Sequence, residues 1–561
     1  MKSASTSWLG GAAALTLVGG AVWWSARHSP APTDRRLEDH LQDAAARDVA
    51  SAPAPEAPSP APPLGCPQAQ PLGVIALPGA GVDALLRFGG GPNAQAGSAA
   101  CGQGVGLRVE AASTDAAWVE ALARGARGAA DGAVLGVVPA ERAAALLTQA
   151  NLEVGAIIRD PAARPQVVVL GLLAESAGDE ALVGPATWAT QPALARGVGV
   201  STRPDGPGWL AARQWALDHG LDVAGEGSAE AADAVHRVDA ADDASARAAL
   251  DEGRCMESPN SQAGKARSVC IEAFAGPMDE VRRALAHNPE LVVLTTTSAY
   301  QGLSATWLVG VRRAIEARPD DITALLSFAL TLERRPAEPA ATRALWLAQV
   351  YPSVSVDAWA TRLAGTRAAT LVDNLDAFER WTGADGRAFA IWRLSSVSRR
   401  PGALSLLSLV DARALEALRT AAPPAPPTLA SWDAAASRPV RGGFDFALEF
   451  KPGAVMPTPA GELALSTLRD RLVLSPGAEF TLTAFGDGLE PSRPPGTPDA
   501  DVPDPEAPTV GTLAEERAGY VVTWLQDHTP RVFAPGRLRA VGSQSQGEGL
   551  RVDWARASER P

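Results

Sequence analysis

Residues 133–150 read AVLGVVPAERAAALLTQA, a short apolar run followed directly by a stretch with helical spacing. The first six residues predict a buried strand, and residues 140–150 predict a helix. The same succession recurs on both sides of this segment, so strands alternate with helices along most of the chain. Such alternation predicts parallel βαβ units and therefore an α/β layer fold.

The other predicted elements follow the same two patterns. The predicted strands are 73–77, 107–111, 133–138, 166–173, 198–201 and 291–297. The predicted helices are 115–124, 140–150, 209–219, 244–251, 278–286 and 306–317, and the segment from residue 321 to about 418 is mostly helical.

Length and composition set the broad class of the protein. The chain has 561 residues, of which 46% are hydrophobic, and a formal net charge of −13. The hydrophobic content excludes wholesale disorder, and the length suggests roughly three or four domains. The acidic balance argues against a nucleic-acid partner, because phosphate binding needs a basic patch.

Clusters of proline mark the predicted domain boundaries. Residues 27–66 form a Pro/Ala-rich spacer, and residues 421–440 form a linker of similar composition. A third proline-rich stretch, residues 490–508, lies within the C-terminal unit. The predicted units are an anchor or signal peptide at 1–26, a body at 67–420, a C-terminal domain at 441–553 and a tail at 554–561.

The only apolar run of membrane length lies near the N-terminus. Residues 8–26 carry no charged side chain and approach the ~20 residues that a membrane-spanning helix needs. Trp23 and Trp24 suit the aromatic belt at a membrane interface and fit a small-residue cleavage site badly. We therefore expect an uncleaved N-terminal transmembrane helix in the inner membrane, with a cleaved signal peptide as the alternative.

The four cysteines form two local pairs along the sequence, Cys66 with Cys101 and Cys255 with Cys270. None belongs to a CxxC motif, so zinc-ribbon and thioredoxin-like sites have no support. Two disulfides would place the body in an oxidising compartment such as a periplasm. Four unrelated buried thiols are the alternative.

Motifs for catalysis, metal binding or cofactor binding are weak. Gly79-x-Gly81-x-x-Ala84 follows a predicted strand and partly matches a dinucleotide fingerprint, but its helix breaks early and Glu110 lies too late to bind the ribose. The six histidines are scattered, without a metal-ligand spacing such as HExxH, and no GxSxG elbow occurs. The sequence therefore predicts no catalytic residues, no metal site, no cofactor and no enzymatic activity.

The order of elements in the body resembles that of type 2 periplasmic solute-binding proteins of the nitrate, sulfonate and thiamine-precursor group. The resemblance implies two α/β lobes that close on a small molecule, as in the substrate-binding components of ABC transporters. The segments that carry it are 74–81, 131–135, 198–201, 209–220, 288–297, 307–320 and 370–378.

Three turns of this body are candidates for ligand contact, because ligands of open α/β sheets bind beyond the carboxyl ends of the strands. Arg203 is the best charged candidate, since arginine binds a carboxylate or sulfonate through two hydrogen bonds. Ordinary turn and capping chemistry is the alternative for each turn. The predicted ligand-binding residues are Gly79, Gly81, Asp83, Ser201, Thr202, Arg203, Thr296 and Thr297.

The C-terminal unit shows the order strand, helix, strand, helix, strand and resembles an OmpA-like peptidoglycan-binding domain of α+β type. The segment LAEERA at 513–518 keeps one family motif, whereas AFGD at 484–487 is a degraded form of the other. The resemblance implies that Asp487 and Arg517 bind the diaminopimelate of the cell-wall stem peptide. The family's Gly, His and Thr are missing from the first motif, which puts wall binding in doubt.

Together these features predict an envelope-tethered solute-binding protein that captures or senses a small molecule, which could be anionic. Its further partners would be peptidoglycan, the inner membrane and a transporter or envelope complex. One alternative is a structural or interaction protein of the envelope with a ligand-free binding-protein fold. Another is an enzyme on a binding-protein scaffold. The predicted location is the periplasm, either anchored or exported and cleaved.

Overall fold

The structure, a computed structural model, describes most of the chain after residue 70. The described residues are 66, 71–160, 162, 164–203, 206–224, 233–257, 268–300, 303–335, 338–378, 380–381, 384–394, 404–421, 440–475, 478–486, 510–529, 533 and 536–556. The predicted N-terminal helix and spacer therefore lie outside the described residues, apart from Cys66. Within the described part, no helix combines the length and the apolar character that crossing a membrane would require.

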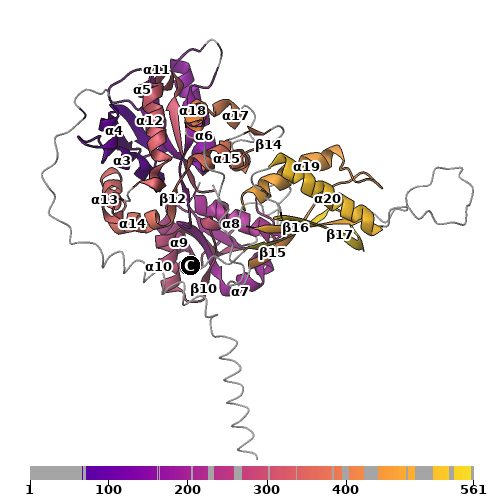
Figure 1. The fold of residues 1–561 in the computed structure, drawn as a ribbon. Coiled ribbons are helices and arrows are strands. Elements are labelled where there is room, and N and C mark those ends of the chain that lie inside the picture. The colour runs from indigo at the N-terminus through magenta and orange to yellow at the C-terminus, as the bar shows by residue number, and fades with distance from the viewer. Residues whose placement is uncertain are drawn as a thin grey trace, which may run out of the picture. The chain divides into compact units, whose positions relative to one another are not determined.

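The first lobe is built on a six-stranded mixed sheet with the order β12-β4-β11-β3-β1-β2. Helices α5, α6, α11 and α12 gather around its strands (Figure 1). The strands are β1 (Leu72–Ala76), β2 (Leu107–Ala111), β3 (Leu135–Pro139), β4 (Val167–Ser176), β11 (Ala305–Val311) and β12 (Thr366–Ala368).

Helices cover both faces of this sheet, and the sequence of β4 shows why. All ten residues of β4 are buried, and neighbouring side chains enter different hydrophobic clusters. Val167 and Val169 join one cluster, whereas Val168 and Leu170 join the other. Side chains alternate between the two faces of a strand, so an unbroken apolar run needs apolar partners on both faces.

The helices of the first lobe come from two stretches of the chain. The N-terminal set comprises α3 (Asp83–Gly89), α4 (Ala99–Gly102), α5 (Asp115–Ala126) and α6 (Ala140–Ile157). The later set comprises α11 (Arg312–Ala317), α12 (Pro319–Ala329), α13 (Ala340–Val350), α14 (Val356–Ala364), α15 (Leu371–Phe378), α16 (Arg387–Leu394), α17 (Leu406–Leu409) and α18 (Arg413–Ala421). Short 3₁₀ turns lie at Ala80–Val82 and Leu332–Arg334, and β13 (Arg380–Trp381) pairs with β14 (Ala384–Asp385).

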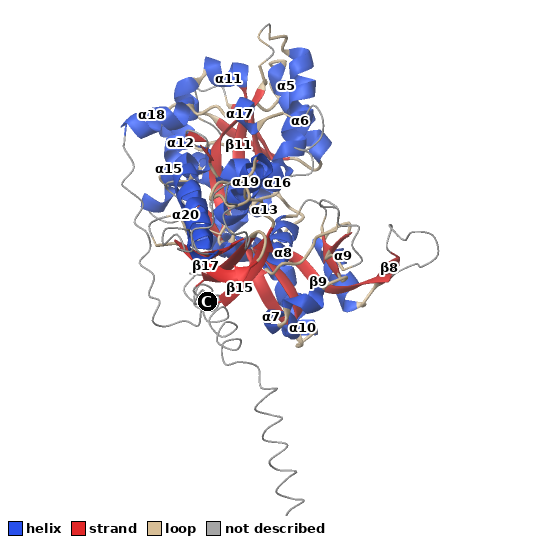
Figure 2. Ribbon diagram, turned by 90° about the vertical axis from the view of Figure 1, so that its right-hand side faces the viewer, coloured by secondary structure: helices blue, strands red, loops and turns tan. Residues whose placement is uncertain are grey.

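The second lobe contains a smaller mixed sheet with the order β10-β5-β9-β6-β7 (Figure 2). Its strands are β5 (Glu180–Pro185), β6 (Gly199–Thr202), β7 (His236–Asp239), β9 (Ser268–Pro277) and β10 (Leu291–Thr296), and β8 (Cys255–Glu257) pairs with β9. Its helices are α7 (Ala186–Thr190), α8 (Pro207–Asp218), α9 (Asp243–Asp251) and α10 (Met278–His287), with 3₁₀ turns at Pro192–Ala195 and Thr297–Ala299. Apolar clusters again occupy both faces of the sheet.

The chain passes between the lobes twice. It leaves the first sheet between β4 and β5, and it returns between β10 and β11. Hydroxyl groups join the two crossing segments, because Ser176 Oγ and Thr297 Oγ1 share a hydrogen bond. Thr297 Oγ1 also donates to the Glu180 carbonyl at 3.2 Å. The two crossing segments between the lobes are therefore hydrogen-bonded to each other.

Most predicted elements of the body agree with the structure to within a few residues, although α6 continues to Ile157, beyond the predicted end at residue 150. One prediction is wrong. Residues 306–317, predicted as one helix, form strand β11 followed by the short helix α11. The strand contains Trp307, Leu308 and Val309, which lie in the middle of the sheet. Local spacing does not distinguish a fully buried strand from a buried helix. The prediction also omitted β5 and β9, whose partners are distant in sequence.

Both local cysteine pairs form disulfides, Cys66–Cys101 and Cys255–Cys270. Cys255 and Cys270 face each other across the β8–β9 pair. The expected disulfides are therefore confirmed, and the structure adds their pairing, which the sequence had left open. A cross-link of this kind restricts the unfolded chain, which is how it stabilises a polar segment with little to bury.

The C-terminal domain has a four-stranded sheet with the order β15-β18-β16-β17 and two helices. Its elements are β15 (Val440–Phe446), α19 (Pro459–Val473), β16 (Glu479–Gly486), α20 (Val510–His528), β17 (Leu538–Gln546) and β18 (Leu550–Arg556). The predicted succession is confirmed, with β18 as an additional strand at the centre. Leu468, Leu482 and Val521 belong to the core between the helices and the sheet.

Candidate functional site

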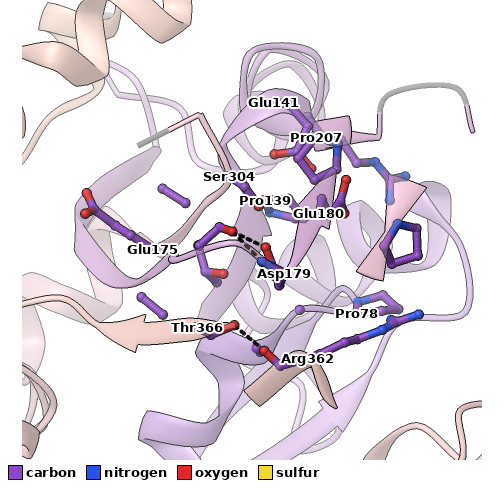
Figure 3. Close-up of a pocket in the computed structure, with 18 of the residues that line it drawn as sticks. Pro78, Pro139, Glu141, Glu175, Asp179, Glu180, Pro207, Ser304, Arg362 and Thr366 are labelled. Carbon is purple, nitrogen blue, oxygen red and sulfur yellow. Dashed lines mark hydrogen bonds between the residues drawn. The ribbon is translucent and has the colours of Figure 1, made fainter. Parts of the chain in front are cut away.

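A cavity of about 100 Å³ lies between the two lobes and is lined by residues of both (Figure 3). A single water molecule needs a cavity volume of roughly 10–15 Å³, so this cavity has room for a small molecule. Its walls follow the carboxyl ends of β1, β3, β6 and β7 and the two crossing segments. This is the edge of an open α/β sheet at which ligands bind.

The turn after β1 approaches the start of β11 closely. Pro78, Gly79 and Ala80 line the cavity, and Thr306 lies opposite them. A Cβ atom on Gly81 would lie 2.4 Å from the Cβ of Thr306, so only glycine fits there. Gly81, one of the glycines predicted as ligand contacts, therefore lets this turn pack against the Thr306 side chain beside the cavity.

The junction of β3 and α6 places Glu141 in the cavity wall. Pro139 precedes α6, and Glu141 stands in its first turn, where the helix dipole favours an acid. Burial nevertheless raises the pKa of Glu141 to about 8. Its Oε2 atom is buried and has no hydrogen-bond partner among the residues that the structure describes. Oε2 of Glu141 is thus a buried acceptor atom without a donor in the described part of the protein.

The first crossing segment contributes two further carboxyl groups. Asp179 accepts hydrogen bonds from the hydroxyls of Ser176 and Thr297, and burial raises its pKa to about 6. Burial, followed by repulsion from Asp179, raises the pKa of Glu180 well above its usual value. Glu141 adds to that repulsion, which places the three acids in one electrostatic cluster.

The second lobe closes the cavity at the start of α8. A Cβ atom on Gly208 would lie 3.0 Å from Oε2 of Glu180 and 2.7 Å from the backbone nitrogen of Gly276. The glycine therefore lets α8 begin close to the Glu180 carboxyl group. Arg203, which lies just before α8, forms an ion pair with Asp243 at 3.5 Å. Burial raises the pKa of Asp243, and Arg203 opposes that rise.

Glu175 lines the same cavity but is fully paired. Both arginines, Arg367 and Arg387, form ion pairs with its carboxylate, and the side chain has no exposure. In Figure 3 this carboxylate points away from Glu141, Asp179 and Glu180. Glu175 is therefore a structural anion of the first lobe.

Trp359 and Arg362 of α14 complete the wall. The Trp359 side chain is buried, and its Nε1 has no hydrogen-bond partner within the described part of the chain. The guanidinium of Arg362 lies 5.3 Å from the Trp359 ring centroid, and its Nε lies 3.8 Å from Asp279 Oδ1. An unpartnered donor and an unpartnered acceptor, Trp359 Nε1 and Glu141 Oε2, thus belong to residues of one cavity.

Two of the eight predicted ligand residues, Gly79 and Arg203, line this cavity. Asp83 instead pairs with Arg343 at 2.7 Å, and Ser201 Oγ donates to the Ala273 carbonyl at 3.2 Å. The remaining assignments are as follows: Thr202 is buried in β6, Thr297 joins the crossing segments, Thr296 shares a hydrogen bond with Ser298, and Gly81 packs against Thr306.

The sequence reasoning missed Glu141, Asp179, Glu180, Asp243 and Arg362. Glu141 could have been found, because it follows a predicted strand at its carboxyl end. Asp179 and Glu180 lie in a crossing segment that only the pairing of β5 defines. Arg362 and Trp359 come from a helix far along the chain, and no local pattern links that helix to the cleft.

The second predicted site, in the C-terminal domain, is described only in part. Asp487 lies outside the described residues. Arg517 is 3% exposed and donates hydrogen bonds to the carbonyls of Ala454, Phe485 and Lys451 at 2.9, 3.1 and 3.2 Å. Its guanidinium also lies 4.8 Å from the Phe450 ring centroid. Arg517 therefore ties the ends of three segments together.

Comparisons with known proteins place the body near solved solute-binding proteins at low similarity. No family model matches the chain, and no curated protein matches it. The periplasmic nitrate-binding protein NrtA from Synechocystis PCC 6803 is 11% identical with a TM-score of 0.39, covering 63% of this chain and 89% of its own. The aliphatic sulphonate-binding protein SsuA from Escherichia coli is 13% identical with a TM-score of 0.34, covering 62% and 92%.

A third solved structure comes from a eukaryote. The Candida albicans CA3427 gene product, described as having the generic periplasmic binding protein fold, is 10% identical with a TM-score of 0.36, covering 61% of this chain and 96% of its own. These similarities are distant, so the case for a function depends on the cleft of this chain.

Proposed function

We propose that this protein binds a small polar solute in the cleft between its two lobes. The observation that carries the proposal is the cavity itself, which both sheets border at their strand ends and the two crossing segments flank. Buried polar atoms are normally hydrogen-bonded, so the unpartnered atoms of Glu141 and Trp359 call for a partner from outside the chain.

The arrangement of the lobes supports reversible closure. In the part of the chain that the structure describes, two short segments connect the sheets, and such segments can act as hinges between domains that close around a ligand. Closure would bring Glu141 of the first lobe and Arg203 of the second onto one molecule. Binding rather than catalysis is proposed, since the cleft groups need only recognise a solute.

A thermal-shift screen of the full chain tests the proposal. The panel contains nitrate, sulfate, methanesulfonate, amino acids and small amines, and a true ligand raises the melting temperature because it binds the folded state. Ser304→Trp fills the cavity and should abolish that rise. Ser113→Trp, an exposed position in the same lobe, should leave it intact.

No rise with any solute, or a rise that Ser304→Trp leaves unchanged, would contradict the proposal. That outcome would favour the alternative of an envelope protein whose body serves as an interaction module.

The two disulfides support export to an oxidising compartment such as the periplasm. Attachment to the inner membrane through residues 8–26 stays a prediction. Fractionation of cells that express the full chain would test it, because an anchored protein stays with the membrane pellet in high salt.

Peptidoglycan binding by the C-terminal domain also stays a prediction. Arg517 is committed to three backbone carbonyls, so Asp487 is the better residue to change. A pull-down of the full chain on diaminopimelate-type peptidoglycan should retain the parent and lose Asp487→Ala if the OmpA-like assignment holds. Equal retention of both proteins would contradict it.

A further inference from the structure

The carboxyl groups of the cleft fall into two classes according to their partners. Glu175 has Arg367 and Arg387, and Asp243 has Arg203. Glu141 and Glu180 have no ion pair of 4.0 Å or less with any described residue. The unpaired carboxyls are therefore concentrated where β3, the first crossing segment and the start of α8 meet.

The arginines of the cleft are each matched by a carboxylate. Arg142 pairs with Asp115, Arg203 with Asp243, and Arg362 lies 3.8 Å from Asp279. An anion entering the cleft would compete with these carboxylates and would also face Glu141, Asp179 and Glu180. A cation would be attracted to the ionised carboxylates of Glu141 and Glu180. Arg203 faces both of these carboxyl groups and Arg142 faces Glu141, so the cation also meets these two positive charges.

We propose that the cleft takes a small organic cation, a protonated primary amine, between the carboxylates of Glu141 and Glu180. This inference rests on the proposed binding function and specifies its ligand class. An ammonium group supplies three donors, and one of them suits Oε2 of Glu141, a buried carboxylate oxygen that lacks a donor among the described residues. A hydroxyl or other acceptor on the ligand would satisfy the unpartnered Nε1 of Trp359.

A metal ion fits this site less well than an amine. Within the described ranges, no group of three or more His, Cys, Asp or Glu side chains is arranged to hold a metal ion. Asp179, the third acid nearby, already accepts hydrogen bonds from Ser176 and Thr297. The site thus offers the carboxyl groups of Glu141 and Glu180 on one cavity, which suit the hydrogen bonds of an ammonium group.

Proton release accompanies this mode of binding. In the empty cleft, burial raises the pKa of Glu141 to about 8 and that of Glu180 well above its usual value. The ammonium ligand keeps its own proton, and the carboxylic protons leave to the buffer as the ion pairs form. Affinity should therefore rise between pH 6 and pH 8.

Isothermal titration calorimetry of the full chain with methylamine, ethanolamine and putrescine tests this inference. We expect at least one amine to bind with proton release, seen as a heat that depends on the ionisation enthalpy of the buffer. The double variant Glu141→Gln with Glu180→Gln should lower affinity by ~10- to 100-fold. Both glutamines are isosteric and remove buried ionisable groups, so the variant should fold.

Glu153→Gln is the matched control, because Glu153 is an exposed glutamate of the same helix, α6. It should bind amines as the parent does. Failure of all three amines overturns the inference, as does amine binding that the double variant leaves unchanged. Binding of nitrate or methanesulfonate that Ser304→Trp abolishes would overturn the cation inference while supporting the binding function. Absence of any Ser304→Trp-sensitive ligand would overturn both.

Discussion

The cleft and the Arg517 site of the C-terminal domain both bury charge, but they satisfy it differently. Arg517 donates to three backbone carbonyls, so its buried guanidinium has hydrogen-bond acceptors within the fold. Glu141 has a buried oxygen without a partner, and Glu180 has no ion pair of 4.0 Å or less with any described residue. Both sites contain buried charged groups. The structural site is the one whose charged group has hydrogen-bond partners within the protein, and the binding site is the one in which charged groups lack partners among the described residues.

The largest expected effect is the loss of Arg517. Arg517→Met should destabilise the C-terminal domain by about 4 kcal/mol, since three carbonyl groups lose a buried donor. Hydrogen exchange of β15 to β18 in the full chain measures this loss. Arg539→Met, at an exposed position of β17, is the control and should change little. Equal hydrogen-exchange rates in Arg517→Met and Arg539→Met would show that Arg517 does not stabilise the domain.

The next effect tests the paired carboxylate of the cleft wall. Glu175→Gln should destabilise the first lobe by about 2 kcal/mol, because it removes the buried carboxylate that Arg367 and Arg387 share and leaves Asp373 as their anionic partner. Scanning calorimetry of the full chain measures the change. Glu153→Gln serves as control and should stay within ~0.5 kcal/mol. A loss of that small size in Glu175→Gln would show that the ion pairs contribute nothing measurable.

Glu141 and Glu180, which have no ion pair within the described part of the chain, should make the free energy of unfolding depend on pH. Their pKa values are higher in the folded chain than in the unfolded chain, so the folded chain holds more protons. The stability of the unliganded protein should therefore fall as pH rises from about 4.5 to about 8. Asp373 does not change this slope, because its pKa of about 2 means that its stabilisation is fully present above pH ~4 and is lost only as pH falls below that value.

Melting temperatures at pH 5 to 8 test this dependence. The double variant Glu141→Gln with Glu180→Gln should show a shallower fall than the parent. Identical slopes in the two proteins would mean that these carboxyls titrate as they do in solvent.

The smallest effect compares two buried tryptophans. Trp118 Nε1 donates to the Val137 carbonyl at 3.1 Å, whereas Trp359 Nε1 has no partner in the described structure. Trp118→Phe should therefore cost about 1 kcal/mol more than Trp359→Phe in urea unfolding. A larger cost for Trp359→Phe would indicate a hydrogen bond at its indole nitrogen.

Local patterns predicted most of the fold. The apolar run at 133–138 and the helical spacing at 140–150 correspond to β3 and α6. Residues 306–317 were predicted wrongly because β11 is buried on both faces and shows no alternation. β18 was missed although its buried positions alternate, and it pairs with β15 more than a hundred residues away.

The candidate site was predicted less well, and the reason is spatial. The turn at 78–83 and Arg203 each follow a predicted strand. They could be predicted because ligands of open α/β sheets bind beyond the carboxyl ends of the strands. Asp179 and Glu180 depend on where the chain crosses between sheets, and Arg362 depends on the packing of α14. These placements come from contacts between distant segments, which a periodic pattern does not encode.

The sequence by itself determined the α/β class, the nearness of each cysteine to one other cysteine along the chain, and the alternation of buried strands and helices. These features depend on residues close together in the chain, through side-chain period and cysteine spacing. Only the tertiary structure decided which acids are paired. Glu175 meets Arg367 and Arg387, while Glu141 faces a cavity, because desolvation and ion pairing are set by neighbours in space.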